Sequence, residues 1–237
     1  MTPTPKLETA QSYLNLHLTR TGRCLPVEPQ EPFITLSREA GAGASSLARL
    51  IANQLNTTLQ PGQTLWRVFD GNLVEAMLRD LNYPEHLARY LPEDSISEID
   101  ASIGELVGLH PNLWELVQHT NCLIRHLAGQ GRCILIGRGA NFATAALPHG
   151  LHLRLIGNVT DRASHMAGLC HTTVTKAADR NARSDAARRR YARTHFDCDI
   201  DDPQAYDLVL NTSSMPLPEI ASAVVHLVHA RTPVAAA

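Results

Sequence analysis

Five short apolar runs recur along the chain and predict β-strands over residues 33–36, 66–69, 133–136, 151–156 and 208–210. Most of them lack a regular polar alternation, which is typical of strands buried on both faces of a sheet. Helical periodicity follows at residues 45–55, after Asp70, at 113–129, at 174–194 and after Pro218. This alternation of strands and helices predicts an α/β fold in which helices sandwich a parallel sheet.

The domain boundaries follow from where this alternation begins, breaks and ends. Residues 1–31 are interpreted as an N-terminal extension, because a short apolar stripe there is followed by closely spaced prolines. Residues 32–230 form the main domain, and a length of 237 residues suits one large core. Residues 84–111 interrupt the alternation with prolines and acids and are interpreted as an insertion, and residues 231–237 as a tail.

Composition narrows the choice of partners. The net charge is −2, so no overall positive charge favours nucleic acid, and no nucleic-acid partner is expected. The N-terminus lacks an apolar signal segment, and no apolar run approaches the about 20 residues that span a bilayer. We therefore expect no membrane association and a cytoplasmic location. The five cysteines include no C-x-x-C pair, so neither a disulfide framework nor a zinc site is expected.

A glycine-rich turn between the first predicted strand and the first predicted helix holds the most informative chemistry. Gly41 and Gly43 permit positive φ angles and a close approach of the backbone to a ligand. The N–H groups at the start of a helix point at such a ligand, and the helix dipole favours negative charge there. Ser45 and Ser46 add hydroxyl groups. This arrangement is typical of a phosphate-binding loop.

The turn departs from the Walker A pattern, G-x-x-x-x-G-K-[ST], at one chemically important position. If Gly43 is the second glycine of that pattern, Ala44 stands where the phosphate-binding lysine is expected. Ser45 or, one residue further along, Ser46 could then hold a magnesium ion. The alternative is an ordinary strand-to-helix turn in which Ser45 caps the helix.

Positive charge gathers in residues 176–193, which hold seven basic side chains and two acidic ones. On a helix, Arg180 and Arg183 share a face, and Arg188 lies within reach further along. Guanidinium groups bind phosphate oxygens in pairs. These arginines, or Arg38 in the turn, can therefore supply the positive charge that a Walker lysine would carry.

Other groups of residues have plainer explanations. The basic segment is also compatible with a solvated helix held by ion pairs such as Asp185 with Arg189. An acidic cluster over residues 197–202 could hold Mg²⁺ or form a solvated loop that caps the next segment. The twelve histidines show no metal-ligand spacing and are interpreted as ordinary polar or core residues. An apolar run over residues 106–117 is either core or a self-association face, so a homodimer is a further expectation.

Six short blocks occur in order along the chain: Ile34-Thr-Leu-Ser-Arg-Glu-Ala-Gly-Ala-Gly, Val68-Phe-Asp70, Leu135-Ile-Gly-Arg-Gly-Ala-Asn141, Leu151-His-Leu-Arg-Leu, Asp185-x-x-Arg188-x-x-Tyr191 and Tyr206-Asp-Leu-Val-Leu-Asn-Thr212. Together they resemble the cytidylate kinase-like family, a branch of the nucleoside monophosphate kinases, over about residues 33–228. The resemblance implies a P-loop NTPase fold with a five-stranded parallel sheet, a monophosphate-acceptor region and an Arg-rich lid, here residues 174–202. Cytidylate kinases transfer the γ-phosphate of ATP to CMP or dCMP with Mg²⁺.

The resemblance also implies a role for individual residues. The donor phosphates of ATP would be cradled by residues of the turn, with Ser46 at the Mg²⁺ ion: Gly41, Gly43, Ala44, Ser45 and Ser46. The acceptor would be bound by four residues: Asp70, Arg138, Arg162 and Asp185. The charge on the transferred group would be met by four arginines: Arg38, Arg180, Arg183 and Arg188. The family's aspartate after Gly-Arg is Gly139 here, and its first two lid residues are Asn181 and Ala182.

These observations favour an ATP-dependent phosphotransferase that acts on a nucleoside monophosphate or a related small acceptor. The replacement of the lysine by Ala44 keeps a second hypothesis open, in which the chain is a nucleotide-binding regulator or pseudokinase without transfer activity. A third hypothesis is a scaffold that has kept only the fold. In the first two cases the partners are nucleotide small molecules.

Overall fold

A computed structural model describes residue 29, residues 31–70 and residues 111–231. The proposed extension up to residue 28, the helix expected after Asp70, the insertion up to residue 110 and the tail from residue 232 lie outside the described residues. In the described part, none of the helices is long and apolar enough to cross a membrane.

Five strands form one parallel sheet in the order β2-β3-β1-β4-β5. They are β1 (Phe33–Arg38), β2 (Arg67–Phe69), β3 (Cys133–Ile136), β4 (Gly150–Ile156) and β5 (Leu208–Asn211). The central strand β1 pairs with β3 on one side and β4 on the other, with Leu36 opposite Ile136 and Leu153. All five apolar runs therefore form strands, and the predicted α/β class is confirmed.

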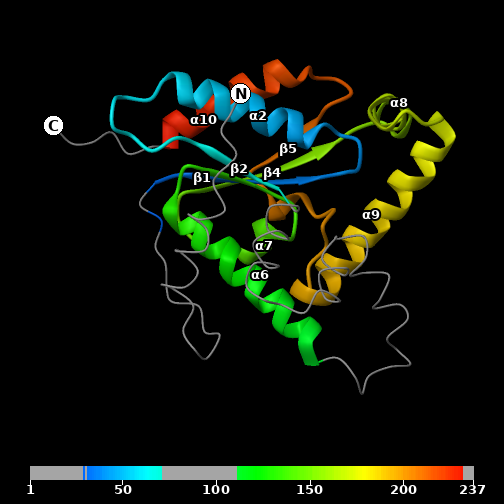
Figure 1. Ribbon diagram of the computed structural model, residues 1–237, viewed down its shortest axis with the longest axis horizontal. Helices are drawn as coiled ribbons and strands as arrows, with labels where there is room; N and C mark the ends of the chain where they lie inside the picture. Colours follow the sequence, from blue (N-terminus) through cyan, green and yellow to red (C-terminus); the bar gives the residue numbers. More distant parts are fainter. Residues whose placement is uncertain (1–28, 30, 71–110, 232–237) are drawn as a thin grey trace.

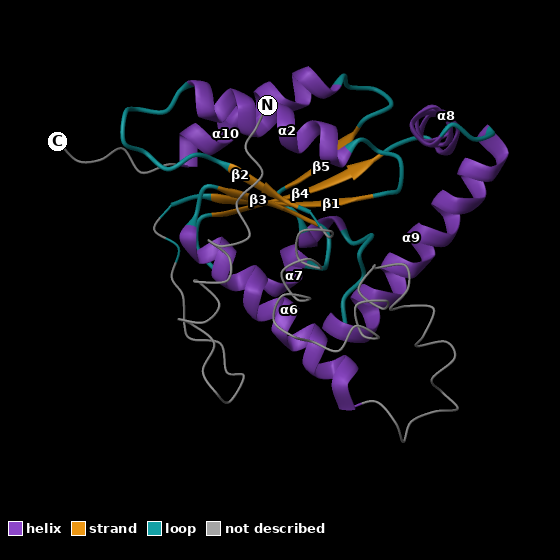
Figure 2. Cartoon of the chain, viewed as in Figure 1, coloured by secondary structure: helices purple, strands orange, loops and turns teal. Residues whose placement is uncertain are grey.

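Helices cover both faces of the sheet (Figures 1 and 2). The α-helices are α2 (Ala44–Thr57), α6 (Pro111–Gln130), α7 (Ala140–Ala143), α8 (Val159–Cys170), α9 (Val174–Phe196) and α10 (Leu217–Arg231). One turn of 3₁₀ helix, η1 (Pro203–Ala205), precedes β5. α2 and α10 lie side by side on one face, whereas α6 and α7 lie on the other. α8 and α9 pack against each other beside the carboxyl end of the sheet, where the glycine-rich turn also lies.

The main core lies between the sheet and the layer formed by α2 and α10. Leu47, Ile51 and Leu55 are spaced four residues apart on α2, and all three are buried against the strands. Burying one such side chain stabilises the fold by about 1.5–3 kcal/mol. Because α2 is fixed in this way, its first turn is held firmly at the carboxyl end of β1.

The structure bears on two further expectations from the sequence, one about the apolar run and one about the cysteines. In the apolar run over residues 106–117, Val117 is core, since it is buried against Tyr191 with Phe196 packed beside them. Cys133, Cys170 and Cys198 are free thiols, but Cys122 is disulfide-bonded. The prediction concerned a disulfide framework, and one disulfide-bonded cysteine is not such a framework.

Candidate functional site

The glycine-rich turn leaves β1 and enters α2 through two left-handed residues. Gly41 and Gly43 both have a φ of 82°, a conformation that favours glycine. Gly43 is the N-cap residue of α2, and no side chain caps this helix end. The alternative in which Ser45 caps the helix is therefore wrong, because Ser45 lies inside the first turn. The helix N-terminus is left open toward a ligand.

The backbone N–H groups of this turn divide into two sets. The Ala42 N–H donates to the Glu39 carbonyl at 3.2 Å, and the Ala40 N–H donates to a carboxylate from α9 at 2.6 Å. Among the described residues, no protein acceptor meets the N–H groups of residues 43–46. These four amides, at the positive end of the α2 dipole, are the donors that an anion would meet.

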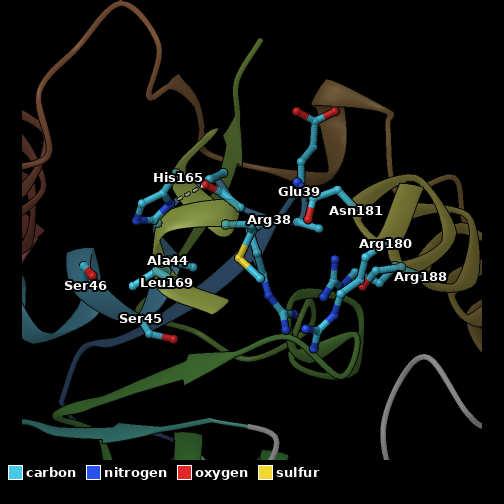
Figure 3. A pocket seen from close by; sticks show the side chains of 16 residues that line it. Arg38, Glu39, Ala44, Ser45, Ser46, His165, Leu169, Arg180, Asn181 and Arg188 are labelled. Carbon is cyan, nitrogen blue, oxygen red and sulfur yellow. Dashed lines mark hydrogen bonds between the residues drawn. The ribbon is translucent and has the colours of Figure 1, made fainter. Parts of the chain in front are cut away.

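A cavity of about 230 Å³ opens in front of these amides (Figure 3). Its floor is the turn itself, residues 38–46, and its walls come from α8 and α9. The walls carry seven side chains: His165, Met166, Leu169, Arg180, Asn181, Ser184 and Arg188. The cavity thus joins helix amides, hydroxyl groups and arginines in one place, which suits a phosphorylated ligand.

Three of the four arginines expected to meet the transferred group line this cavity. Arg38, Arg180 and Arg188 lie on one side of it, and Ser45, Ser46 and His165 lie on the other (Figure 3). Arg183 is exposed on α9 and lines neither of the two cavities found among the described residues. Ala44 is buried, with 7% of its surface exposed, so α2 brings no positive charge to the cavity at that position.

Asp185 on α9 binds the backbone of the turn. Its Oδ1 accepts hydrogen bonds from the Ala40 N–H at 2.6 Å and from Arg188 Nη1 at 3.1 Å. Its Oδ2 accepts from Arg162 Nη1 at 2.9 Å. The expected ion pair between Asp185 and Arg189 is wrong, because Arg189 binds Asp201 instead. Asp185 therefore ties α9 to the turn and orients Arg188.

Arg162, at the start of α8, is buried in the same network. Its guanidinium donates to the carbonyl oxygens of Ala40 and Gly157, each at 2.8 Å, and lies 3.3 Å from the Glu39 carboxylate. Glu39 in turn accepts from the Gly157 N–H at 2.9 Å. Arg162 was expected at the acceptor, but here its hydrogen bonds go to the protein. These contacts fix the shape of the turn.

A second, smaller cavity of about 20 Å³ lies beyond the end of β1, and Arg38 and Arg188 line both cavities. Gly139 lies on the wall of the smaller cavity, and Phe196 closes the space beside it. A Cβ at Gly139 would lie 2.3 Å from Phe196 Cε2, so an aspartate cannot occupy this position without movement of that ring. Arg138 is buried nearby with a φ of 57°, and Asp70 follows the last residue of β2.

Two cavity residues were missed by sequence reasoning. Asn181 is buried, with 4% of its surface exposed, and neither its Nδ2 nor its Oδ1 has a hydrogen-bond partner. An unpaired buried amide is costly, about 1–3 kcal/mol for each polar group, so this side chain marks a place where a ligand fits. His165 contacts the Gly41 carbonyl oxygen through Nδ1 at 2.8 Å. His165 belongs to no recognisable motif, and Asn181 stands at the first position of the family's lid motif without the family's residue there, so only the fold could reveal their place in the cavity.

The acidic cluster over residues 197–202 forms a structural loop. Asp202 caps η1 through the Gln204 N–H, and Asp201 accepts from Arg154 at 2.5 Å and from Arg189 at 2.6 Å. Burial disfavours the charged form of Asp201, but the hydrogen bonds and charges of both arginines outweigh it and hold the pKa of this carboxyl below its ordinary value. The described residues contain no group of three or more His, Cys, Asp or Glu side chains that could hold a metal.

A central strand of a parallel sheet that leads through a glycine-rich turn into an open helix N-terminus matches the α/β fold of the kinase type. The model of the cytidylate kinase-like family matches residues 33–214. The chain therefore belongs to the cytidylate kinase-like family. Membership of this family supports a phosphotransferase in general.

Solved structures are similar to this chain at low sequence identity, and the first of those named here shares its fold. An uncharacterized protein from Eubacterium ventriosum is 14% identical, with a TM-score of 0.64 over 85% of this chain and 99% of that one. A gluconokinase from Sinorhizobium meliloti is 11% identical, with a TM-score of 0.47 over 86% and 94% of the two chains. A shikimate kinase from Bacteroides thetaiotaomicron is 12% identical, with a TM-score of 0.46 over 84% and 98%. No curated protein matches the sequence.

Proposed function

We propose that this chain is an ATP-dependent phosphotransferase whose donor phosphates bind in the cavity at the N-terminus of α2. The observation that carries the proposal is the uncapped first turn of α2, whose amides face the cavity together with Arg180 and Arg188. Asn181 supports it, because its buried and unpaired amide lies in the wall of the same cavity. Backbone amides and guanidinium groups are the groups that proteins use to hold phosphates.

The residues in the first turn of α2 fit a magnesium ion bound together with the phosphates. Ser45 and Ser46 are both exposed at the cavity, and either hydroxyl can act as a ligand, with Ser46 as our proposal. Mg²⁺ usually takes few protein ligands and completes its shell with phosphate oxygens and water, so an acidic cluster is not required. When bound, Mg²⁺ neutralises charge on the phosphates.

Arg38 and Arg188 are proposed to act where the phosphoryl group passes between donor and acceptor. Both line the two cavities, so their guanidinium groups can reach a group moving from one to the other. Phosphoryl transfer requires mainly position and positive charge from the protein, and we assign no general base. Residues 174–202 would act as the lid that carries Arg188 to this place.

The acceptor is proposed to bind beside the second cavity, at the carboxyl ends of β2 and β3. Asp70 and Arg138 follow these two strands, as the family resemblance requires for a nucleoside monophosphate or a related small acceptor. The Phe196 ring fills the space beside Gly139, so the base of an acceptor nucleotide would not be recognised by an aspartate at this position as it is in the family. Arg162 and Asp185 would contribute indirectly, by shaping the turn and orienting Arg188.

A nucleotide-binding regulator or pseudokinase is the second candidate. The observation that favours it is the buried methyl group of Ala44, which leaves α2 without the lysine that usually reaches the β- and γ-phosphates. In this case the cavity would bind nucleotide and the chain would not transfer phosphate.

Calorimetry with Mg-ATP, followed by a coupled assay with CMP, dCMP, UMP and AMP, tests the proposal. We expect Arg188→Ala to weaken Mg-ATP binding by about tenfold to a hundredfold, since it removes a charged hydrogen-bond donor. We expect Arg38→Ala to have an effect of the same order. Arg190→Ala is the matched control, because Arg190 is exposed on the same helix and lines neither cavity.

The outcomes separate the candidates. Binding with turnover supports the phosphotransferase, and binding without turnover for any acceptor supports the regulator. If Arg38→Ala and Arg188→Ala both bind Mg-ATP as the unmodified chain does, the proposed role of these arginines is wrong. If the unmodified chain binds no Mg-ATP, only a scaffold role remains.

A further inference from the structure

His165 lies on the wall of the donor cavity that faces the arginines (Figure 3). Its Nδ1 is 2.8 Å from the Gly41 carbonyl oxygen, and a carbonyl oxygen can only accept a hydrogen bond. Nδ1 must therefore carry the proton of the neutral ring. The second nitrogen, Nε2, is then an acceptor when the ring is neutral and a donor when the ring is charged.

The ring lies beside the start of α2. A Cβ at Gly43 would lie 3.9 Å from His165 Cε1, the ring atom that is bonded to both nitrogens. Gly43 directly precedes Ala44, whose buried methyl group stands where a Walker lysine is expected. The imidazole thus lies next to the position at which α2 itself supplies no positive charge.

The other charged groups of this cavity come from different elements. Arg38 and Glu39 come from the end of β1 and the turn, and Arg180 and Arg188 come from α9. The side chains that α2 contributes to the lining carry no charge. Among the described cavity residues of α8, His165 is the one whose side chain can carry a charge. A cation on the α8 side would therefore complete a ring of positive groups around the bound phosphates.

We propose that His165 takes the place of the missing Walker lysine, and that its Nε2–H binds a donor phosphate from the α8 side of the cavity. This inference rests on the proposed function, because it assumes a phosphorylated ligand at the N-terminus of α2. The ring is exposed, and the hydrogen bond to Gly41 favours this orientation before the ligand arrives, so less side-chain entropy is lost on binding. The same bond couples the ring to the conformation of the turn.

A charge-bearing histidine has a consequence that a lysine does not. Histidine side chains gain or lose their charge within about pH 5–8, and a neighbouring anion favours the charged form. Mg-ATP should therefore bind with uptake of a proton, and more tightly at about pH 6 than at about pH 8. Protonation of the ATP phosphates at low pH lowers their negative charge and so weakens binding. This effect is the same for every variant.

The test is calorimetric titration with Mg-ATP at about pH 6 and about pH 8, in buffers of different ionisation enthalpy that reveal proton uptake. His165→Asn is the first variant, because its amide can still donate to the Gly41 carbonyl but has no second nitrogen to charge. His165→Gln is a second variant with a longer reach. The double variant Ala44→Lys with His165→Asn asks whether a lysine on α2 replaces the lost charge.

We expect the unmodified chain to bind about tenfold more tightly at about pH 6 than at about pH 8, with proton uptake. Both single variants should lose the proton uptake and bind weakly at either pH, and the double variant should regain affinity without proton uptake. If His165→Asn and His165→Gln keep the affinity and proton uptake of the unmodified chain, the role of His165 is wrong while the nucleotide site stands. If the unmodified chain binds no Mg-ATP at either pH, the proposed function itself fails.

Discussion

At Gly41 the backbone leaves no room for a side chain. Its φ is 82°, and a Cβ there would lie 2.5 Å from the carbonyl oxygen of Arg162 and 3.0 Å from Asn181 Nδ2. The first of these neighbours is backbone, so it cannot turn away as a flexible side chain can. The close packing of α8 and α9 onto the turn therefore depends on glycine at this position.

Gly41→Ala should lower the free energy of unfolding by more than the about 1–3 kcal/mol that a strained backbone position costs, because a steric clash is added. Thermal unfolding measures the effect. Gly62→Ala is the matched control, since Gly62 also has a positive φ, of 90°, but no atom lies within 4 Å of its Cβ position. Equal losses in both variants would show that the turn tolerates a side chain and that its packing matters little.

Residue identity alone predicted only part of the site. Gly41, Gly43, Ser45 and Ser46 form a strand-turn-helix pattern whose chemistry is local, so the sequence was sufficient to find them. His165 and Asn181 enter the cavity from helices more than a hundred residues later, and neither residue is of the type that a phosphate-binding motif uses at its position. Their roles depend on tertiary packing, which a single sequence does not display.

At the scale of elements, α9 is joined both to the turn and, through Asp201, to the carboxyl end of β4. Asp185 joins the helix to the Ala40 N–H, and further along Arg189 shares Asp201 with Arg154 of β4. Arg154 is buried and also donates to Ser37 Oγ at 3.0 Å. The position of α9, and hence of the cavity arginines, is set by hydrogen bonds at two separate points.

Asp201→Asn should make the chain less stable at neutral pH, by about 1 kcal/mol or less because the carboxyl is partly exposed and solvent screens it. Since the folded-state pKa of Asp201 lies below its ordinary value, its contribution is present above about pH 4 and is lost as the pH falls through the folded-state pKa. Urea unfolding at about pH 7 and about pH 3 should thus show a difference that shrinks in acid. A difference that stays constant across this range would contradict the argument.

The strands were predictable, whereas the short helix α7 and the helix α8 were not. Each strand is a compact apolar run, and the long helices α2, α9 and α10 follow the expected ranges within a few residues. The pattern gave no separate signal for α8, because its buried positions are Arg162, Ala163 and Ala167 while Val159 and Leu169 are exposed. α8 packs against α9 and binds the turn through Arg162, and only a few of its residues are buried.

At the scale of the whole molecule, a chain of net charge −2 places Arg38, Arg180 and Arg188 around one cavity. The layers on the two faces hold the sheet, and the carboxyl ends of β1 and β4 lead into the turn and α8 (Figure 1). Two cavities meet there at Arg38 and Arg188. This is the end of a parallel sheet at which α/β proteins commonly bind their ligands.

The central claim is that the first turn of α2 binds phosphate through its backbone amides. The most direct measurement is a titration of the ¹⁵N-labelled chain with Mg-ATP, followed by amide chemical shifts. The account predicts that the largest changes fall on residues 43–46, whose N–H groups meet no protein acceptor in the described part of the chain. Unchanged amides at these positions, while signals elsewhere respond to the nucleotide, would contradict it.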